Sequence, residues 1–241
     1  RAHRHRVGLM DADDLTPIAQ DYLKVIWSAV EWGEPPITTK ALAERFATSQ
    51  ANVSGTMRRL EAQGLVSYEP YKPVALTGLG QRLAVAMVRR HRLIETFLAE
   101  VLGYGWEEVH DDAELLEHAA SERFLTRIDA ILGHPATDPH GDPIPTAEGR
   151  WSPQAGAIRL AAAAPGSYRV ARVDDSDPGT LSRLRALRIA PGVRLVVRDR
   201  PPAIARADGT PIELAPDDLD AVRVRPDGGA APQGSLPAVP D

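Results

Sequence analysis

The run from Trp106 to His118 constrains the fold most strongly, because it holds the densest cluster of metal-capable side chains in the sequence. In a helix, which advances by about 100° per residue, four possible ligands at i, i+4, i+7 and i+8 share one face. These ligands are His110, Glu114, Glu117 and His118. The opposite side carries Leu115, Leu116, Ala119 and Ala120, and we expect that side to face the core. A solvated acidic face on a surface helix is the alternative interpretation of this segment alone.

Two other segments supply further possible ligands. His91 and Glu95 stand at i, i+4 in the preceding predicted helix, and Asp21 lies in an apolar-periodic helix near the N-terminus. This spacing allows three helices to converge on one or two divalent ions. Because the chain has no cysteine, oxygen and imidazole must supply all the ligands.

Length, charge and hydropathy limit the classes of protein that fit. A chain of 241 residues can form one large domain or two small ones, and we expect two. The formal net charge of −5 argues against a surface that coats nucleic acid, although a local basic reading head remains possible. No apolar run approaches the roughly 20 residues needed to span a bilayer, and the N-terminus lacks an apolar signal region. We therefore expect a cytoplasmic protein with no membrane partner.

The order of predicted elements between residues 13 and 77 is helix, helix, helix, then a two-stranded wing. Thr16-Pro17 predicts the start of the first helix, and a third helix is predicted from about Ser49 to Gln63. Two short β-rich runs, at 65–69 and 74–77, follow it. This order is typical of a winged helix-turn-helix DNA-binding domain, although many three-helix units with this pattern bind no DNA.

The third helix suits DNA because its first turns carry small and polar residues, while arginines follow further along. The wing adds one lysine. The candidate DNA contacts are Ser49, Gln50, Ala51, Asn52, Ser54, Gly55, Thr56, Arg58, Arg59 and Lys72.

The rest of the chain predicts a helical region followed by a small β-barrel, which makes the fold class α+β. Residues 78–133 are predicted to be helical, and their apolar positions Leu83, Met87 and Leu93 fit either an internal core or a dimer interface. Residues 134–165 are rich in Pro, Gly and Ala and predict a linker or an ordered loop rather than a helix or strand. Residues 166–226 hold short β-rich runs with a possible helical insert, and 1–12 and 227–241 are predicted to be a disordered arm and tail.

Four separated motifs together indicate a family. They are Tyr68-Glu69-Pro70-Tyr71-Lys72 with Leu76-Thr77-Gly78-Leu79-Gly80, Arg90-His91-Arg92-Leu93-Ile94-Glu95, Val109-His110-Asp111 through Glu117-His118, and Gly141-Asp142-Pro143-Ile144-Pro145. In these motifs the chain resembles the diphtheria-toxin-repressor family of metal-dependent regulators, and within it the manganese-sensing members. The resemblance implies a winged helix-turn-helix domain, a helical dimerisation and metal-binding region, and a C-terminal SH3-like domain. It also implies a homodimer that binds double-stranded operator DNA and represses metal-uptake genes.

The resemblance also implies two metal sites per subunit. The regulatory site matches at Asp21, Glu114, Glu117 and His118, where Asp21 and Glu114 replace the Met and Cys of iron-sensing members. The second site matches at His91, Glu95 and His110, with Asp177 as the positional match for a ligand from the SH3-like domain. Two carboxylates in place of soft sulfur ligands favour Mn(II), although Fe(II), Co(II) or Zn(II) should still bind.

The sequence allows three other functions. An iron-dependent regulator of the same family is the first alternative. A metalloenzyme is the second, but di-metal oxidases carry Glu-x-x-His on two helices, whereas Leu115 and Val88 stand three residues before His118 and His91. A module that binds proline-rich peptides is the third, but its β region holds only Tyr168 as an aromatic residue. We therefore expect neither catalysis nor a small-molecule substrate.

Overall fold

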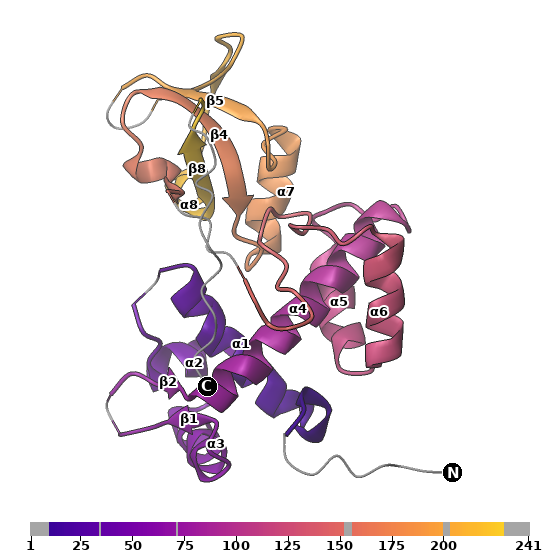
Figure 1. The fold of residues 1–241 in the computed structure, drawn as a ribbon. Coiled ribbons are helices and arrows are strands. Elements are labelled where there is room, and N and C mark those ends of the chain that lie inside the picture. Colours follow the sequence, from indigo (N-terminus) through magenta and orange to yellow (C-terminus); the bar gives the residue numbers. More distant parts are fainter. Residues whose placement is uncertain (1–9, 34, 71, 152–155, 200–202, 229–241) are drawn as a thin grey trace. The chain divides into compact units, whose positions relative to one another are not determined.

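The computed structural model describes residues 10–33, 35–70, 72–151, 156–199 and 203–228. These residues form two compact units, and the boundary between them falls within one long helix. The first unit comprises the described residues up to 89 together with 145–150, and the second comprises 90–144 and the described residues from 151 onward. Figure 1 shows the chain coloured from indigo to yellow along the sequence.

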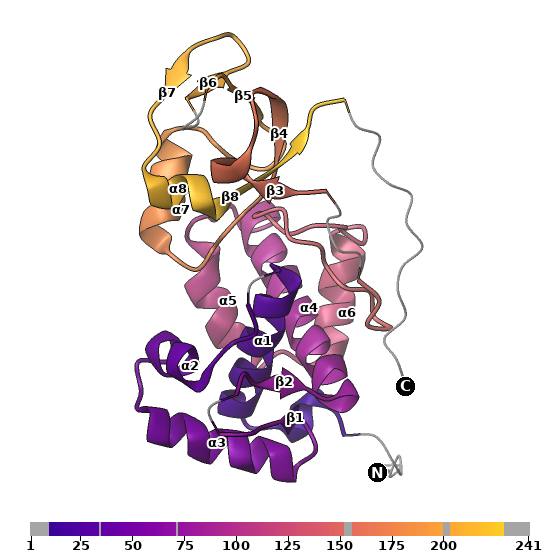
Figure 2. The same ribbon diagram turned by 90° about the vertical axis from the view of Figure 1, so that its left-hand side faces the viewer.

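The first unit is a three-helix domain with a short β-hairpin. Its elements are η1 (Ala12–Asp14), α1 (Pro17–Glu31), α2 (Thr39–Arg45), α3 (Gln50–Ala62), β1 (Val66–Ser67), β2 (Ala75–Leu76) and the start of α4 (Gly78–Glu100). Thr16, Thr38 and Ser49 begin α1, α2 and α3, because each hydroxyl accepts a hydrogen bond from a backbone N–H in the first turn. Figure 2 shows α2 and α3 joined by a turn, with the hairpin beside α3.

The core of this unit is formed by apolar residues of its helices. Leu42, Val53, Met57 and Leu60 are buried, and the rings of Tyr22 and Phe46 stack with centroids 4.2 Å apart. The hairpin joins α4 closely at Gly80, where a Cβ atom would stand 1.9 Å from the carbonyl oxygen of Leu65. The predicted helix, turn, helix and wing are therefore all present, although the two strands are shorter than predicted.

The second unit begins with a helical layer. It contains the end of α4 together with α5 (Val109–Glu117) and α6 (Glu122–Ile131). Leu93, Ile94, Val109, Leu125 and Ile128 form its buried core. Leu83 and Met87, in the part of α4 that belongs to the first unit, are buried too. All three α4 positions that fitted either a core or an interface are therefore buried within a single chain.

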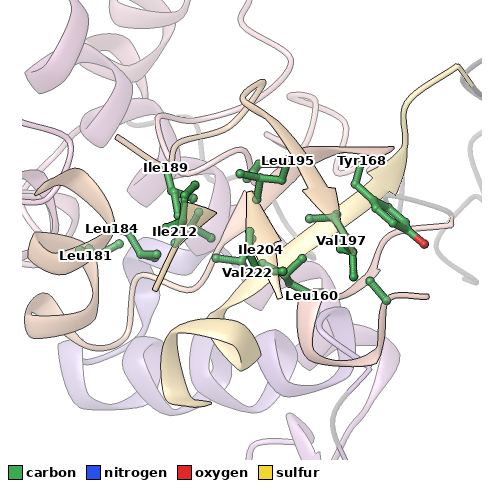
Figure 3. Packing of buried hydrophobic residues seen from close by; sticks show 14 residues of the cluster. Leu160, Tyr168, Leu181, Leu184, Ile189, Leu195, Val197, Ile204, Ile212 and Val222 are labelled. Atoms are coloured by element: carbon green, nitrogen blue, oxygen red, sulfur yellow. The ribbon is translucent and has the colours of Figure 1, made fainter. Parts of the chain in front are cut away.

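The rest of the second unit is an antiparallel six-stranded sheet with two short helices. Along the sheet the order is β3 (Ile158–Arg159), β8 (Val222–Pro226), β4 (Gly166–Val173), β5 (Arg194–Val197), β6 (Ile204–Arg206) and β7 (Pro211–Ile212). The helices α7 (Pro178–Ala186) and α8 (Pro216–Ala221) and the turn η2 (Leu160–Ala162) complete the domain. Inward residues of alternate strand positions and of α7 form one apolar cluster, which Figure 3 shows.

Two predicted segments differ from the structure. The stretch predicted as a linker, 134–165, contains β3 and η2, and its first part is a loop in which residues 140–145 are buried. The loop carries backbone hydrogen bonds of its own, including Ile144 N to Ala136 O, so it is an ordered part of the second unit up to Ile144. Ala12, predicted within the arm, is buried in η1. Residues 1–9 and 229–241 lie outside the described residues.

Among the described residues, no helix is both long enough and apolar enough to cross a bilayer.

Candidate metal centre

The ligand-bearing face of α5 is its buried face. Glu117 is fully buried beside Val109 and Ala113, whereas Leu115 is 75% exposed and Leu116 is 44% exposed. The prediction that the leucine side faces the core is therefore wrong. Apolar periodicity failed here because the interior side of the helix is occupied by carboxylates and imidazoles that pair with side chains of α4.

One group of possible ligands lies between α4, α5 and the segment that leads into α7. One ligand atom from each of His91, Glu95, His110 and Asp175 lies within 4.8 Å of the others. The Glu95 Oε1 atom is 2.9 Å from His91 Nε2 and 3.4 Å from His110 Nδ1, and Asp175 Oδ2 is 3.5 Å from His110 Nδ1. We call these four residues the second-site group. Three of them, all but Asp175, were predicted from the sequence.

Asp175, rather than Asp177, is the carboxylate that the β domain brings to this group. The side chain of Asp177 is exposed and begins α7, where it accepts hydrogen bonds from the backbone N–H groups of Gly179 and Thr180 and from the Thr180 hydroxyl. An aspartate before Pro178 is a typical helix cap. This capping role takes Asp177 away from the second-site group, and the expectation for that position is corrected to Asp175.

His140 is a further candidate ligand that the sequence analysis missed. Its Nδ1 atom lies 3.7 Å from Glu95 Oε2 and 3.9 Å from Asp175 Oδ2, and its Nε2 lies 2.7 Å from the carbonyl oxygen of Trp106. Since a carbonyl only accepts, Nε2 is the nitrogen that donates, and Nδ1 is directed toward the carboxylates. The sequence did offer a signal for His140, because it directly precedes the Gly141-Asp142-Pro143 motif. It was missed because it lies within a stretch predicted as a linker.

A buried ionic network holds the loop that presents His140. One oxygen of Asp138 accepts hydrogen bonds from the backbone N–H groups of His140 and Asp142, each 2.9 Å long. Arg92 of α4 donates to the carbonyl oxygen of Pro143 and to Asp142, and Arg172 of β4 pairs with the other oxygen of Asp142 at 3.1 Å. The network therefore connects α4, the loop and the sheet within the second unit.

Electrostatics in the group reflect this crowding of charges. Burial raises the pKa of Glu95, but His91, His110 and His140 outweigh burial and hold it well below its usual range. Burial lowers the pKa of His110, but Asp175 and Glu95 reverse this effect and raise it to about 10. The same balance, dominated by Glu95, raises the pKa of His140 to about 10. Burial, reinforced by Glu95, raises the pKa of Asp138 to about 7.

The donor atoms fit a divalent cation. Both carboxylate oxygens of Glu95 and the Nδ1 atoms of His110 and His140 are buried, and although they face one another as charged groups, none forms a well-aligned hydrogen bond with a described residue. Buried polar atoms that lack hydrogen bonds are costly, so a cluster of them indicates a ligand site. Carboxylate and imidazole together are ligands of Mn²⁺, Fe²⁺, Co²⁺ and Zn²⁺.

A second group of possible ligands lies on the same face of α5, nearer its C-terminal end. Ligand atoms of Glu114, Glu117 and His118 lie within 4.8 Å of one another. His91 connects the two groups, because its Nδ1 lies 2.7 Å from Glu117 Oε2 while its Nε2 faces Glu95. Asp21, the remaining predicted ligand of this site, is a half-buried residue in the middle of α1, in the first unit.

Most candidate DNA contacts lie on the open side of α3 and the wing. Ser49, Gln50, Ala51, Asn52, Arg58, Arg59 and Lys72 are exposed, and Ser54 and Gly55 are half-buried. Thr56 differs, because its side chain is buried and its hydroxyl accepts a hydrogen bond from Arg59 Nη2 at 2.9 Å. The Thr56 hydroxyl therefore orients the Arg59 side chain. Ser54 accepts a hydrogen bond from the Tyr68 hydroxyl and so ties α3 to the wing.

Comparison with family models covers all three domains. Residues 14–74 match the "Iron dependent repressor, N-terminal DNA binding domain", 77–146 match the "Iron dependent repressor, metal binding and dimerisation domain", and 158–226 match the "FeoA domain". The iron-dependent repressor IdeR of Mycobacterium tuberculosis (strain H37Rv) is 33% identical over 201 residues, which cover 78% of this chain and 87% of IdeR. The chain belongs to the diphtheria-toxin-repressor family. It is therefore a metal-dependent, DNA-binding transcriptional repressor and not an enzyme.

Solved structures extend the comparison. A manganese-dependent transcriptional repressor in complex with manganese is 47% identical and superposes with a TM-score of 0.80, covering 86% of this chain and 99% of that one. The manganese regulator SloR is 30% identical with a TM-score of 0.75, covering 88% of this chain and all of that one. The diphtheria toxin repressor of Corynebacterium diphtheriae is 35% identical over 132 residues, 55% of this chain and 58% of that protein.

Proposed function

We propose that the protein is a manganese-activated repressor that binds operator DNA as a homodimer and controls metal-uptake genes. The observation that carries the choice of manganese is the ligand set, in which Glu114 stands beside Glu117 and His118, the chain has no cysteine and α1 contains no methionine. Mn²⁺ prefers carboxylate and imidazole ligands, whereas thiolate and thioether ligands favour softer ions. The similarity to a repressor solved with manganese supports this choice.

Two ion sites per subunit are part of the proposal. The first is formed by Asp21, Glu114, Glu117 and His118. The second is formed by His91, Glu95, His110 and Asp175, and His140 lies within reach of the same two carboxylates. A bound divalent cation supplies the positive charge that allows these carboxylates to lie close together. Fe(II), Co(II) and Zn(II) share the relevant ligand preferences and should bind as well.

Asp21 is the residue through which the first site would act on DNA binding. It belongs to α1, a helix of the DNA-binding domain, whereas the other three ligands belong to the second unit. Carboxylates at positions 21, 114 and 117 repel one another when held together without a cation. We infer that a bound cation removes this repulsion and fixes α1, which favours the conformation that binds DNA.

A homodimer is implied by the dimerisation domain, and the structure offers a surface for it. Leu115 and Leu116 of α5 and Phe124 and Ile131 of α6 are exposed apolar side chains. Exposed apolar residues on the helices of a dimerisation domain are typical of an interface between copies of one chain. We propose that these residues contact a second copy of the chain. The resulting dimer has two recognition helices, one in each subunit, as a symmetric operator requires.

An anaerobic titration tests the proposal. Operator duplexes would first be selected from a random-sequence pool with the Mn²⁺-loaded protein, and binding would then be measured at fixed salt against Mn²⁺, Fe²⁺ and Zn²⁺. We expect DNA binding to appear with Mn²⁺ at concentrations at which Fe²⁺ does little. Equal or stronger activation by Fe²⁺ would instead assign the protein to the iron-dependent branch, which the description of the matching family models favours.

A matched pair of variants tests the site. Glu114→Ala removes a proposed ligand, and Asp111→Ala removes an exposed carboxylate of the same helix that lies outside both groups. We expect Glu114→Ala to raise the Mn²⁺ concentration needed for DNA binding by at least about 100-fold, since even residues that only orient ligands contribute roughly 10 to 100-fold. Asp111→Ala should behave as the unaltered protein. An unchanged Mn²⁺ dependence in Glu114→Ala would contradict the assignment.

A further inference from the structure

The outer face of the β domain carries arginines in register across three strands. Arg169 of β4 is paired with Arg194 of β5 on one side and with Arg225 of β8 on the other. Residues directly opposite each other in antiparallel strands place their side chains on the same face of the sheet. The neighbouring residues Tyr168, Leu195 and Val224 point into the apolar cluster, so the arginines point outward. We call Arg169, Arg194 and Arg225 the arginine row.

The fold only partly neutralises this row. Asp227 bridges two of its members, with Oδ1 3.2 Å from Arg169 Nη2 and Oδ2 2.8 Å from Arg194 Nε. Within the described residues Arg225 makes no ion pair. Like charges directly opposite on adjacent strands destabilise a sheet. Arg169 also donates a hydrogen bond to the carbonyl oxygen of Gly192, 2.7 Å long. After pairing with Asp227, the row keeps an excess of two positive charges.

A second set of arginines on the same sheet shows the contrast. Arg223 is in register with Arg159 on one side and Arg172 on the other. Here the flanking members have carboxylate partners, Asp220 for Arg159 and Asp142 for Arg172. Arg172 and Arg223 are also buried. This second set is largely buried within the second unit, whereas Arg169 and Arg194 are exposed and Arg225 is half-buried.

The β domain that carries the row is more positively charged than the rest of the chain. Residues 158–226 contain twelve arginines against nine carboxylates, a net charge of +3, although the complete chain has a net charge of −5. The winged helix-turn-helix residues 14–74 contain six basic and seven acidic side chains, a net charge of −1. DNA affinity depends strongly on the neutralisation of phosphates by Lys and Arg. The recognition domain alone has no net positive charge with which to supply this neutralisation.

We propose that the arginine row is a second DNA-binding surface, which holds the phosphodiester backbone of duplex DNA outside the bases read by α3. The inference rests on the DNA-binding function. Strands lie about 4.8 Å apart, so three arginines span roughly 10 Å, which matches the axial rise over about three phosphate steps on one DNA strand, at roughly 3.4 Å per step. Arginine binds phosphate in a bidentate manner. The carboxylate of Asp227, held between two guanidinium groups, marks the position of one anionic group.

Salt dependence of DNA binding tests this surface. The full-length, Mn²⁺-loaded protein would be titrated into a labelled 40-bp random-sequence duplex at 50 and 200 mM salt. Replacing two phosphate contacts should lower the slope of log K against log salt by about 1.8, so the affinity of the unaltered protein should fall about twelvefold more than that of Arg169→Gln/Arg194→Gln. The control Arg188→Gln/Arg198→Gln removes the same charge from exposed positions of the same domain outside the row.

A variant with the opposite sign completes the test. Asp227→Asn removes the competing carboxylate and should strengthen binding to the same duplex, and thermal unfolding would verify that each variant is folded. Equal salt slopes in the unaltered protein and Arg169→Gln/Arg194→Gln would overturn the proposal. Binding to polyglutamate, an acidic polypeptide, would be measured as well. If Arg169→Gln/Arg194→Gln lost affinity for polyglutamate but kept its affinity for DNA, the row would bind acidic protein segments instead, which would also overturn the proposal. Failure of the unaltered protein to bind its selected operator with Mn²⁺ would instead contradict the proposed function, because that outcome does not involve the row.

Discussion

His91 is the residue on which the two proposed metal sites depend together. Its Nε2 faces Glu95 at 2.9 Å, and its Nδ1 faces Glu117 at 2.7 Å. If Nε2 serves as a ligand, Nδ1 must carry the proton and donate it to Glu117, which fixes the orientation of that carboxylate. One imidazole thus acts as a ligand in one site and as a positioning residue in the other.

Replacing His91 should therefore weaken both sites. For His91→Gln we expect an affinity loss of roughly 10 to 100-fold at each site, measured by isothermal titration with Mn²⁺. His134→Gln is the matched control, since His134 is exposed and pairs only with Asp129 among the described residues. A variant that lost one site and kept the other at full affinity would show that the sites are independent.

The raised pKa values of His110 and His140 predict that metal binding competes with protons. Both pKa values are about 10 in the metal-free protein, so both rings are protonated at pH 7 and must lose a proton before Nδ1 can bind an ion. Mn²⁺ affinity should therefore rise between pH 6 and pH 8. Titration in two buffers of different ionisation enthalpy should show release of about two protons per subunit, and release of none would contradict this protonation state.

The same shifts fix the direction of a change in stability. A histidine whose pKa is raised by folding stabilises the native state below its unfolded pKa of about 6.5, and this contribution is lost as the pH rises through about 10. Glu95 acts in the opposite direction, because its lowered pKa gives stability that is lost as the pH falls.

At the scale of elements, the helices were predictable from the sequence and the loop between α6 and the sheet was not. Thr16 and Ser49 cap helices where their sequence context predicted them, and the strands β4, β5, β6 and β8 coincide with β-rich runs. The loop has a composition typical of a linker, yet it is fixed by Arg92 and Arg172, residues distant in sequence. Local composition carries no information about such long-range ion pairs.

The candidate metal site was predictable only in part, because local sequence does not reveal long-range contacts. The spacing of His91 and Glu95 on one helix predicted two members of the second-site group, because a helix fixes i, i+4 geometry. Asp175 and His140 lie in irregular segments, whose geometry depends on tertiary contacts. The sequence pointed to Asp177, but in the structure Asp177 caps α7 and Asp175 lies in the second-site group.

Asp138 should control the second site through the loop that carries His140. Asp138→Ala removes the acceptor for the backbone N–H groups of His140 and Asp142, and we expect a loss of Mn²⁺ affinity of roughly 10 to 100-fold at that site. Asp138→Asn keeps an acceptor oxygen and should retain most of the affinity. If both variants lost affinity equally in a Mn²⁺ titration, the charge of Asp138 would matter rather than its hydrogen bonds.

The exposed side of α6 allows a test of the proposed dimer. Ile131 is 66% exposed, so Ile131→Asp should leave the fold of one chain intact while placing a charge in the interface. We expect the dimer dissociation constant to rise by about 100-fold or more, a change of about 3 kcal/mol, measured by analytical ultracentrifugation. Ile158→Asp, at an exposed apolar position on β3, is the control. Unchanged dimerisation in Ile131→Asp would place the interface elsewhere.

At the scale of the whole molecule, the buried network of Arg92, Asp142 and Arg172 makes the helical layer and the sheet of the second unit one body. Asp142 pairs with both arginines, and its side chain is almost completely buried. Ions placed in this way are costly to separate, because removal of one partner leaves uncompensated buried charge. The second-site group takes ligands from both parts of this body, from α4 and α5 and from the segment after β4.

The link between metal binding and DNA binding must be reciprocal. If Mn²⁺ raises operator affinity by a given factor, operator DNA must raise Mn²⁺ affinity by the same factor, because both ligands favour one conformation. For Asp21→Ala we expect this factor to fall toward one while the Mn²⁺ affinity of the second site is kept, since Asp21 is the only proposed ligand that comes from the DNA-binding domain. The measurement is a Mn²⁺ titration with and without saturating operator. A coupling factor that survived Asp21→Ala would show that the metal acts on DNA binding by a route other than α1.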